Sequence, residues 1–383
     1  MALPKVLVVS GTRPEAIKLA PVVHALESSK KIETIVVATG QHRSMLDQVN
    51  RLFGIEPRYD LDVLKDRPDL AGITAAIVQG LGPILEAERP DLLMVQGDTT
   101  TVFAAALAAF YAKVPVAHVE AGLRTGDRYN PFPEEINRRL TTSLTSLHLA
   151  PTATSRANLL AEGVDPESIH VTGNTVIDAL LDVTARHLPA TDPALAGVAE
   201  SKSTVLITSH RRENWGEPMA NIGRAIARLS TAFPETMFVL PAHLNPTVRD
   251  TLLPPLAGLA NVIVTEPVDY VDMAFLLTAS TIVITDSGGV QEEAPSLGKP
   301  VLVLRETTER PEAVEAGTVR LIGTDEEAIV AEATELLTDR AAYEAMAHAV
   351  NPYGDGLAAR RILGAVEYFF GLGPRPESFT PSA

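Results

Sequence analysis

The sequence contains no cysteine among its 383 residues, which excludes disulfides, thiolate zinc sites and a cysteine nucleophile. No G-x-G-x-x-G follows an apolar run and no G-x-x-x-x-G-K-S/T occurs, so tightly bound NAD and P-loop ATP chemistry are disfavoured. Its His, Asp and Glu residues do not fall in H-E-x-x-H or another zinc spacing. The sequence therefore predicts no metal and no other cofactor.

Basic residues are in the minority: 32 Lys+Arg against 48 Asp+Glu give a formal charge of −16, and no basic patch is visible. Such a charge repels nucleic acid and anionic membranes, although a few cations in a cleft can still bind a small anion. No stretch approaches the roughly 18 to 20 apolar residues needed to cross a bilayer. Residues Met1–Ser10 do not resemble a secretory signal either. We expect a cytoplasmic protein with no nucleic-acid or membrane partner.

Short apolar runs alternate with helix-length segments, a pattern typical of buried parallel strands in an α/β sheet. The runs fall into two similar halves: KVLVVS from Lys5, TIVVAT from Thr34, DLLMVQ from Asp91, VPVAHV from Val114 and SLHLAP from Ser146, then TVLITS from Thr204, TMFVLP from Thr236, NVIVTE from Asn261, TIVITD from Thr281 and PVLVLR from Pro300. The sequence thus predicts two Rossmann-like, doubly wound α/β domains that face a cleft.

We place the domain boundary near Gly173, so that residues 1–172 form the N-terminal domain and residues 173–355 the C-terminal one. An amphipathic helix is expected from about Gly356 to Phe370. Its periodicity does not say which domain it covers. We assign residues from about 356 to 383 to the first domain.

Polar motifs follow six of the apolar runs, where doubly wound folds bind their ligands. They are GTRPE, TGQH, GDTTT, EAG, SHRREN and DSGG. Any single one could be an ordinary turn, because Gly, Asp and Thr are common turn residues. Six such strand ends in two halves are hard to attribute to turns alone.

Two of these motifs suggest a phosphate ligand. In DSGGVQEEAPSLGKP, the N–H groups of Ser287, Gly288 and Gly289 would lie at a helix start, where the dipole favours a phosphate. In GTRPEAIKLAP, Arg13 and Lys18 can reach a diphosphate, the alternative being two solvated cations on a helix start.

A third motif, HVEAGLRTGDRYNPFPEEINRRLT, places Glu120 at a strand end and Glu134 at a helix start. With Asp98 of GDTTT and His210 of SHRREN, it predicts an acid/base assembly of three carboxylates and an imidazole. The alternative is a structural cluster of ion pairs.

Taken in order, GTRPEAIKLAPV, TGQH, QGDTTT, HVEAGLRTG, PFPEEINRRL, TGNTVID, SHRREN and TDSGGVQEEAPSLGKPVLVLRETTERPE resemble the non-hydrolysing UDP-N-acetylglucosamine (UDP-GlcNAc) 2-epimerase family. The matches run from about residue 10 to 325. The resemblance implies a two-domain fold similar to the GT-B glycosyltransferases and a homodimer. It also implies conversion of UDP-GlcNAc to UDP-N-acetylmannosamine (UDP-ManNAc) for cell-surface polysaccharide, by elimination of UDP to a 2-acetamidoglucal and re-addition.

The resemblance also implies roles for individual residues. Asp98, Glu120 and Glu134 match the catalytic carboxylates, and His210 matches a histidine on the phosphate side. The residues expected to bind UDP or the substrate are Arg13, Lys18, Arg211, Met273, Ser287, Gly288, Gly289 and Glu293, with Glu293 on the ribose and Met273 where an aromatic residue commonly covers the uracil. A second UDP-GlcNAc would act as an allosteric activator at Gln41, Arg67, Glu134, Arg211 and His243.

Other activities share this fold or this ligand. A hydrolysing epimerase would release free sugar, and a 2-epimerase of a UDP-diacetamido-uronic acid would need an extra cation near C6. A GT-B glycosyltransferase would need an acceptor groove, and fold alone does not exclude it. A non-catalytic nucleotide-sugar sensor would not need its carboxylates.

Overall fold

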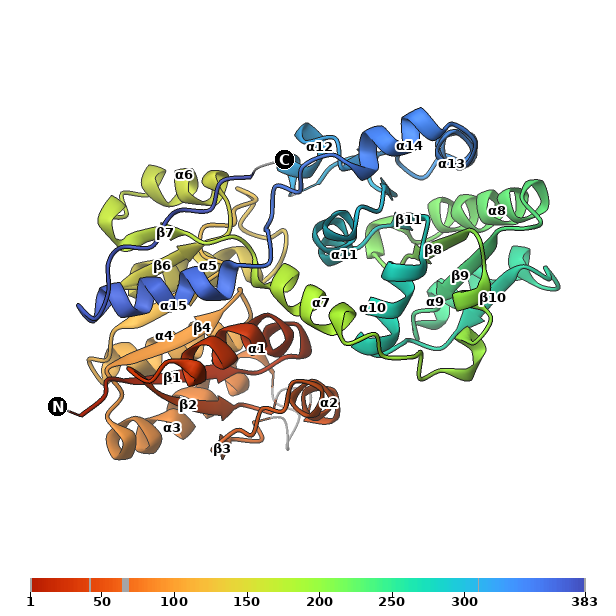
Figure 1. The fold of residues 1–383 in the computed structure, drawn as a ribbon. Helices are drawn as coiled ribbons and strands as arrows, with labels where there is room; N and C mark the ends of the chain where they lie inside the picture. Colours follow the sequence, from red (N-terminus) through yellow and green to blue (C-terminus); the bar gives the residue numbers. More distant parts are fainter. Residues whose placement is uncertain (1, 41–42, 64–68, 309, 382–383) are drawn as a thin grey trace. The chain divides into compact units, whose positions relative to one another are not determined.

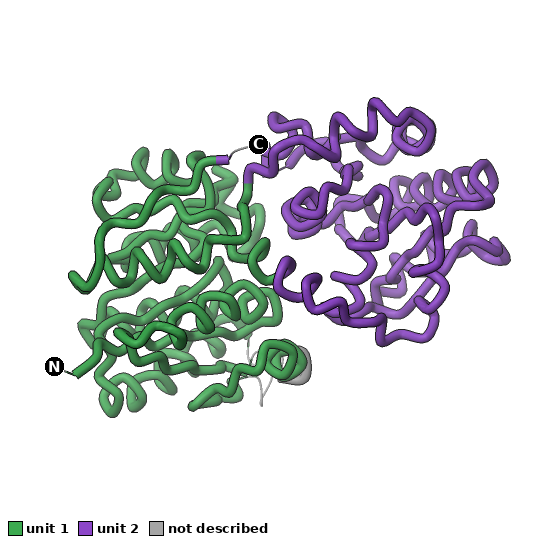
Figure 2. The backbone as a smooth tube through the Cα atoms, in the orientation of Figure 1, with its two compact units in different colours: residues 1–179, 353–380 green, residues 180–352, 381–383 purple. Residues whose placement is uncertain are grey.

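The computed structural model describes residues 2–40, 43–63, 69–308 and 310–381. The chain forms two compact units (Figure 2). The first contains residues 1–179 and 353–380, and the second contains residues 180–352 and 381–383.

The first unit is built on a sheet of seven parallel strands. Its strands and helices are β1 (Lys5–Ser10), α1 (Arg13–Ser28), β2 (Glu33–Ala38), α2 (Arg43–Phe53), β3 (Tyr59–Asp60), α3 (Leu70–Glu88), β4 (Leu92–Gln96), α4 (Thr100–Tyr111), β5 (Val116–Val119), α5 (Glu134–Leu144), β6 (Leu147–Ala150), α6 (Ala153–Ala161), β7 (Ile169–Val171) and α15 (Ala358–Phe369). Helices α1, α2 and α15 form one helical layer and α3, α4 and α5 form another (Figure 1).

The second unit is built on a sheet of six parallel strands. It is entered through α7 (Thr175–Ala185), and its further elements are β8 (Thr204–Thr208), α8 (Glu217–Ala232), β9 (Met237–Pro241), α9 (Pro246–Leu252), β10 (Val262–Thr265), α10 (Tyr270–Ala279), β11 (Ile282–Thr285), α11 (Gly288–Glu293), β12 (Val301–Val303), α12 (Pro311–Glu315), β13 (Val319–Leu321), α13 (Glu326–Thr338) and α14 (Arg340–Ala347).

Both sheets are doubly wound, which confirms the predicted fold class. Their strand orders are β3-β2-β1-β4-β5-β6-β7 and β10-β9-β8-β11-β12-β13. The order reverses between β1 and β4 in the first sheet and between β8 and β11 in the second. At such a reversal the connecting helices leave to opposite faces, and the loops after the two strands form the usual ligand site.

The first unit extends to Ala179, past the boundary that we placed at Gly173, because the start of α7 packs on the returning chain. The N–H of Asn174 donates to the carbonyl of Tyr353 at 2.7 Å. The carboxylate of Asp178 accepts the N–H of Ala359 at 2.8 Å and so caps α15. Helix α15 in turn packs on α1.

The expectation that no stretch is long and apolar enough to cross a bilayer is wrong. Helix α3 is apolar and long enough to cross a bilayer by length and composition, with a mean hydropathy of 1.4 over 18 residues. It is the crossover helix between β3 and β4. Its Ile77 and Leu81, both fully buried, pack with Leu7 of β1 and Leu93 of β4 in the core of the first unit. One face of α3 therefore packs in this core.

Candidate active site

The loops after β1 and β4, on either side of the strand reversal in the first unit, are joined by Glu15. Its Oε2 accepts the N–H of Gly11 at 2.6 Å and that of Thr12 at 3.0 Å, and its Oε1 accepts the hydroxyl of Thr99. Burial raises the pKa of Glu15 to about 7, although these hydrogen bonds oppose the shift. Our sequence reasoning missed this residue; the T-x-x-E pattern of a helix capping box was the available signal.

Lys18 forms an ion pair with Glu120. Its Nζ contacts both carboxylate oxygens, at 2.7 and 2.8 Å. Gln96 and Asn174 also donate to this carboxylate, whose side chain is only 6% exposed. Glu120 has a φ of +66°, a left-handed conformation that costs a non-glycine residue about 1–2 kcal/mol. The contacts from these three side chains hold the Glu120 carboxylate at the end of β5.

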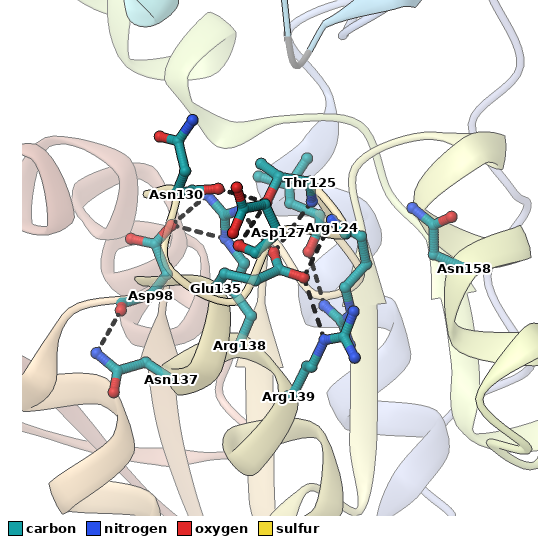
Figure 3. Close-up of polar contacts among 12 residues, drawn as sticks. Asp98, Arg124, Thr125, Asp127, Asn130, Glu135, Asn137, Arg138, Arg139 and Asn158 are labelled. Carbon is teal, nitrogen blue, oxygen red and sulfur yellow. Dashed lines mark hydrogen bonds and ion pairs between the residues drawn. The ribbon is translucent and has the colours of Figure 1, made fainter. Parts of the chain in front are cut away.

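Asp98 follows β4 and is held by α5 (Figure 3). Its Oδ2 lies 2.7 Å from Nη2 and 2.9 Å from Nε of Arg138. The amide of Asn137 donates to the Asp98 carbonyl at 2.9 Å. On the other side, the ring Nε2 of the buried His118 lies 2.7 Å from the carbonyl of Gly97. Both the backbone and the side chain of Asp98 are therefore fixed.

Glu134 is the first residue of α5, the helix that also carries the side chains that hold Asp98. Partial burial raises its pKa, and the negative charge of Asp98 raises it further, while Arg138 opposes the shift. A raised pKa makes a carboxylate a stronger base and so favours a role in proton transfer. The structure thus brings Asp98 and Glu134 together, with Glu120 at the end of the neighbouring strand.

In the second unit, Asp286 organises the loop after β8. Its buried carboxylate accepts the N–H groups of His210 at 2.9 Å and Arg211 at 3.0 Å and the hydroxyl of Ser209 at 2.9 Å. The His210 ring lies with Nδ1 3.3 Å from Asp286. Partial burial lowers the pKa of His210, and the Asp286 carboxylate opposes the shift. Sequence reasoning quoted Asp286 only as the start of DSGG and missed this role.

Ser287, Gly288 and Gly289 start α11, which continues into a 3₁₀ turn at Ala294–Leu297. A side chain at Gly288 would approach the guanidinium of Arg310 to 2.5 Å, so Arg310 would have to move to admit it. Arg310 is held 2.6 Å from the Glu292 carboxylate. Arg310 lies near the end of the stretch TDSGGVQEEAPSLGKPVLVLRETTERPE, and sequence reasoning missed its contact with the helix start, because that contact depends on the fold.

The other sequence-predicted residues of the second unit lie on α10 and α11 and in the loop after β9. Glu293 is buried at the end of α11 and accepts the Tyr270 hydroxyl at 3.3 Å. Met273 is half-buried on α10. The His243 ring stacks on that of His210, with centroids 5.7 Å apart.

Two positions of the predicted activator site, Gln41 and Arg67, lie outside the described residues. Arg13 is half-buried at the start of α1 and forms no ion pair with a residue that the structure describes. The structure therefore brings the predicted residues together as two sets, one at the strand reversal of each sheet.

Comparison with known proteins identifies the family of this chain. A family model described as UDP-N-acetylglucosamine 2-epimerase matches residues 24–367. The chain belongs to this family. The UDP-N-acetylglucosamine 2-epimerase of Salmonella typhimurium is 52% identical over 372 residues, which cover 95% of this chain and 99% of that protein.

Solved structures of the 2-epimerase family share the whole fold. The UDP-GlcNAc 2-epimerase of Neisseria meningitidis, bound to UDP-GlcNAc, has a TM-score of 0.87 and 49% identity, covering 96% of this chain and 100% of that chain. The UDP-GlcNAc 2-epimerase of Methanocaldococcus jannaschii, in complex with UDP-GlcNAc and UDP, has a TM-score of 0.78 and 34% identity, covering 95% of this chain and 99% of that chain. These findings confirm the predicted family, its UDP-GlcNAc 2-epimerase (isomerase) activity and its GT-B-like architecture.

Proposed function

We propose that the 2-epimerase acts without hydrolysis, by eliminating UDP and adding it back. The C2 hydrogen of UDP-GlcNAc is not next to a carbonyl, because the anomeric carbon is a glycosyl phosphate. A base therefore removes the C2 proton as the C1–O bond breaks, and the electron pair of that bond leaves with UDP. The intermediate is 2-acetamidoglucal. Return of a proton to the opposite face of C2, with re-formation of the C1–O bond, gives UDP-ManNAc.

Asp98, Glu120 and Glu134 are proposed to act jointly as the groups that take and return the C2 proton. The raised pKa of Glu134, shifted by burial and then by the charge of Asp98, supports this assignment. Closely spaced carboxylates titrate as a set, so the role on each face belongs to the group.

The cations are proposed to stabilise the departing diphosphate, since charge that develops in the transition state is stabilised best by fixed donors. His210 and Arg211 would serve from the second unit, and Arg13 and Lys18 from the first. The helix start at Ser287, Gly288 and Gly289 is proposed to bind phosphate, Glu293 the ribose and Met273 the uracil, since methionine can cover a flat ring.

Proton NMR of UDP-GlcNAc with the enzyme in deuterium oxide tests this mechanism. We expect deuterium to enter at C2 and UDP-ManNAc to accumulate, because the proton removed from C2 exchanges with solvent before a solvent-derived one returns. Retention of hydrogen at C2 during epimerisation would contradict the mechanism. Free N-acetylmannosamine released in stoichiometric yield with UDP would instead favour the hydrolysing reaction.

We further propose that the enzyme is a homodimer, formed through the outer surface of α3, α4 and α5. Phe110 and Tyr111 at the end of α4 are 58% and 67% exposed, and Leu140 of α5 is 43% exposed. Helices α4 and α5 pack side by side, so these side chains belong to adjacent parts of one layer. Exposed apolar patches of this kind are typical of interfaces between subunits.

Substitution of Phe110 by Asp is expected to shift the sedimentation of the enzyme from dimer to monomer at micromolar concentration, because a charge would be buried in the interface. The matched control is Leu372→Asp, which changes an apolar side chain that is 39% exposed beyond α15. A Phe110→Asp protein that sediments as the wild type would rule out this surface.

The resemblance to the family also supports a second UDP-GlcNAc as an activator, to which Glu134, Arg211 and His243 would contribute. We propose that the enzyme works in the cytoplasm, where UDP-ManNAc would supply the synthesis of cell-surface polysaccharide.

A further inference from the structure

Helix α5 carries a buried chain of charges directly after Glu134. Arg138, 9% exposed, contacts Asp98 through both Nε and Nη2, and its Nη1 lies 3.4 Å from Oε2 of Glu135. Glu135 is fully buried. Three charged groups therefore lie in a row, in the order Asp98, Arg138 and Glu135 (Figure 3).

Glu135 also fixes the loop that precedes α5. Its carboxylate accepts the N–H of Thr125 at 3.0 Å and that of Gly126 at 3.4 Å. Burial alone would raise the pKa of Glu135, but the Thr125 N–H and the two arginines Arg138 and Arg139 hold it below its ordinary value. Glu135 is therefore ionised at neutral pH and keeps a negative charge beside Arg138.

Such a row of buried charges contributes little to the stability of the fold. Removing an ion pair from water costs several kcal/mol per ion, and apolar residues of similar volume often stabilise a fold as well or better. Its geometry has a different consequence. Both contacts from Arg138 end on Oδ2 of Asp98, so Oδ1 takes no part in them. Arg138 thus holds the Asp98 carboxylate through Oδ2, and this contact fixes the orientation of the carboxylate.

We propose that Arg138 is a positioning residue that orients the Asp98 carboxylate for proton transfer, and that Glu135 keeps Arg138 in place while it anchors the loop at Thr125 and Gly126. This inference rests on the proposed catalytic role of Asp98. Arg138 itself acts through Asp98, and an error of about 1 Å in such a group can cost about 100-fold in rate.

The chain offers a matched pair of variants for the test. Arg138 and Arg139 are neighbours on α5 and both contact Glu135, but only Arg138 contacts Asp98. Arg138→Met is expected to lower kcat by about 100-fold with little change in KM, because orientation of a catalytic group matters more in the transition state than in substrate binding. Arg139→Met is expected to keep kcat within about 3-fold of the wild type, because its side chain is a half-exposed surface arginine.

The pH profile supplies a readout that a purely structural role would not move. Because the charge of Arg138 lowers the pKa of Glu134, its removal raises that pKa further. The acid limb of the kcat/KM profile of Arg138→Met should therefore move to higher pH, by up to about 1 unit. Arg138→Lys keeps the positive charge but loses the two-point contact. The acid limb of its kcat/KM profile should therefore lie at the wild-type pH, while its kcat stays below that of the wild type.

The inference would be overturned if Arg138→Met and Arg139→Met lost activity equally, or if the pH profile of Arg138→Met were unchanged. If Arg138→Met does not fold, the kcat of the folded Arg138→Lys protein tests the inference. A kcat equal to that of the wild type would contradict orientation of Asp98 by the guanidinium. Deuterium exchange at C2 by the wild type separates the two proposals. Its absence would refute the proposed mechanism, whereas exchange by the wild type and by Arg138→Met at equal rates would refute only the positioning role.

Discussion

Asp98→Asn is expected to lower kcat for epimerisation by about 100- to 10,000-fold, the usual contribution of a general acid or base. The substitution removes a proton-accepting oxygen but keeps the shape of the side chain. The Asp98 carbonyl would still accept the Asn137 amide, and Arg138 would keep Glu135 as a partner, so the fold should survive. Rates of UDP-ManNAc formation and of deuterium entry at C2 should fall together.

The matched control for this substitution is Asp127→Asn, in the loop before α5. The Asp127 carboxylate is exposed and caps the N–H of Tyr129 at 2.9 Å, without contact to Asp98 or Arg138 in the described structure. Its kcat should stay within about 3-fold of the wild type. Asp98→Asn activity within tenfold of the wild type, with the control also active, would remove Asp98 from the proposed catalytic set.

The central strands could be predicted because each is buried on both faces, which leaves a continuous apolar run in the sequence. All ten predicted runs contain a strand. The strands that were missed, β3, β7 and β13, contain two or three residues each and lie at sheet edges. Edge position alone does not explain the misses, since the edge strand β10 was predicted; two or three residues are too few to give a clear apolar run.

The positions of the candidate site were also readable, because parallel strands end at one edge of a sheet and the polar motifs follow those ends. What each side chain contacts was not readable. Glu15 and Thr99 are 84 residues apart, and Lys18 and Glu120 are 102 apart. These contacts join α1 to residues that follow β4 and β5, and no spacing within one motif encodes them. The roles of the individual site residues therefore stay predictions.

Lys18 illustrates this limit. From the sequence it is a cation for the diphosphate, whereas in the structure both oxygens of Glu120 contact its Nζ. The two roles are compatible if the Lys18 ammonium contacts both the Glu120 carboxylate and a phosphate of the substrate during the reaction. They differ in what the loss of Lys18 does to the enzyme without substrate.

Lys18→Met is expected to destabilise the first unit by about 3–5 kcal/mol, because it leaves the Glu120 carboxylate buried without its cation. Activity should be lost as well. Unfolding by urea, followed for the wild type and the variant, measures the change. The control is Lys31→Met, which breaks the Lys31–Glu367 pair at 2.8 Å; its lysine side chain is 51% exposed, and the expected cost is about 0–1 kcal/mol.

The double variant Lys18→Met/Glu120→Gln separates stability from chemistry. Because the glutamine carries no charge, it needs no cation. In the wild type Gln96 and Asn174 donate to different oxygens of Glu120, so the glutamine carbonyl oxygen keeps one of these two donors. Most of the lost stability should return, while epimerisation stays absent because the carboxylate is gone. A double variant no more stable than Lys18→Met would mean that the cost comes from lost packing of the lysine stem. A Lys18→Met variant as stable as Lys31→Met would mean that Lys18 does not neutralise Glu120.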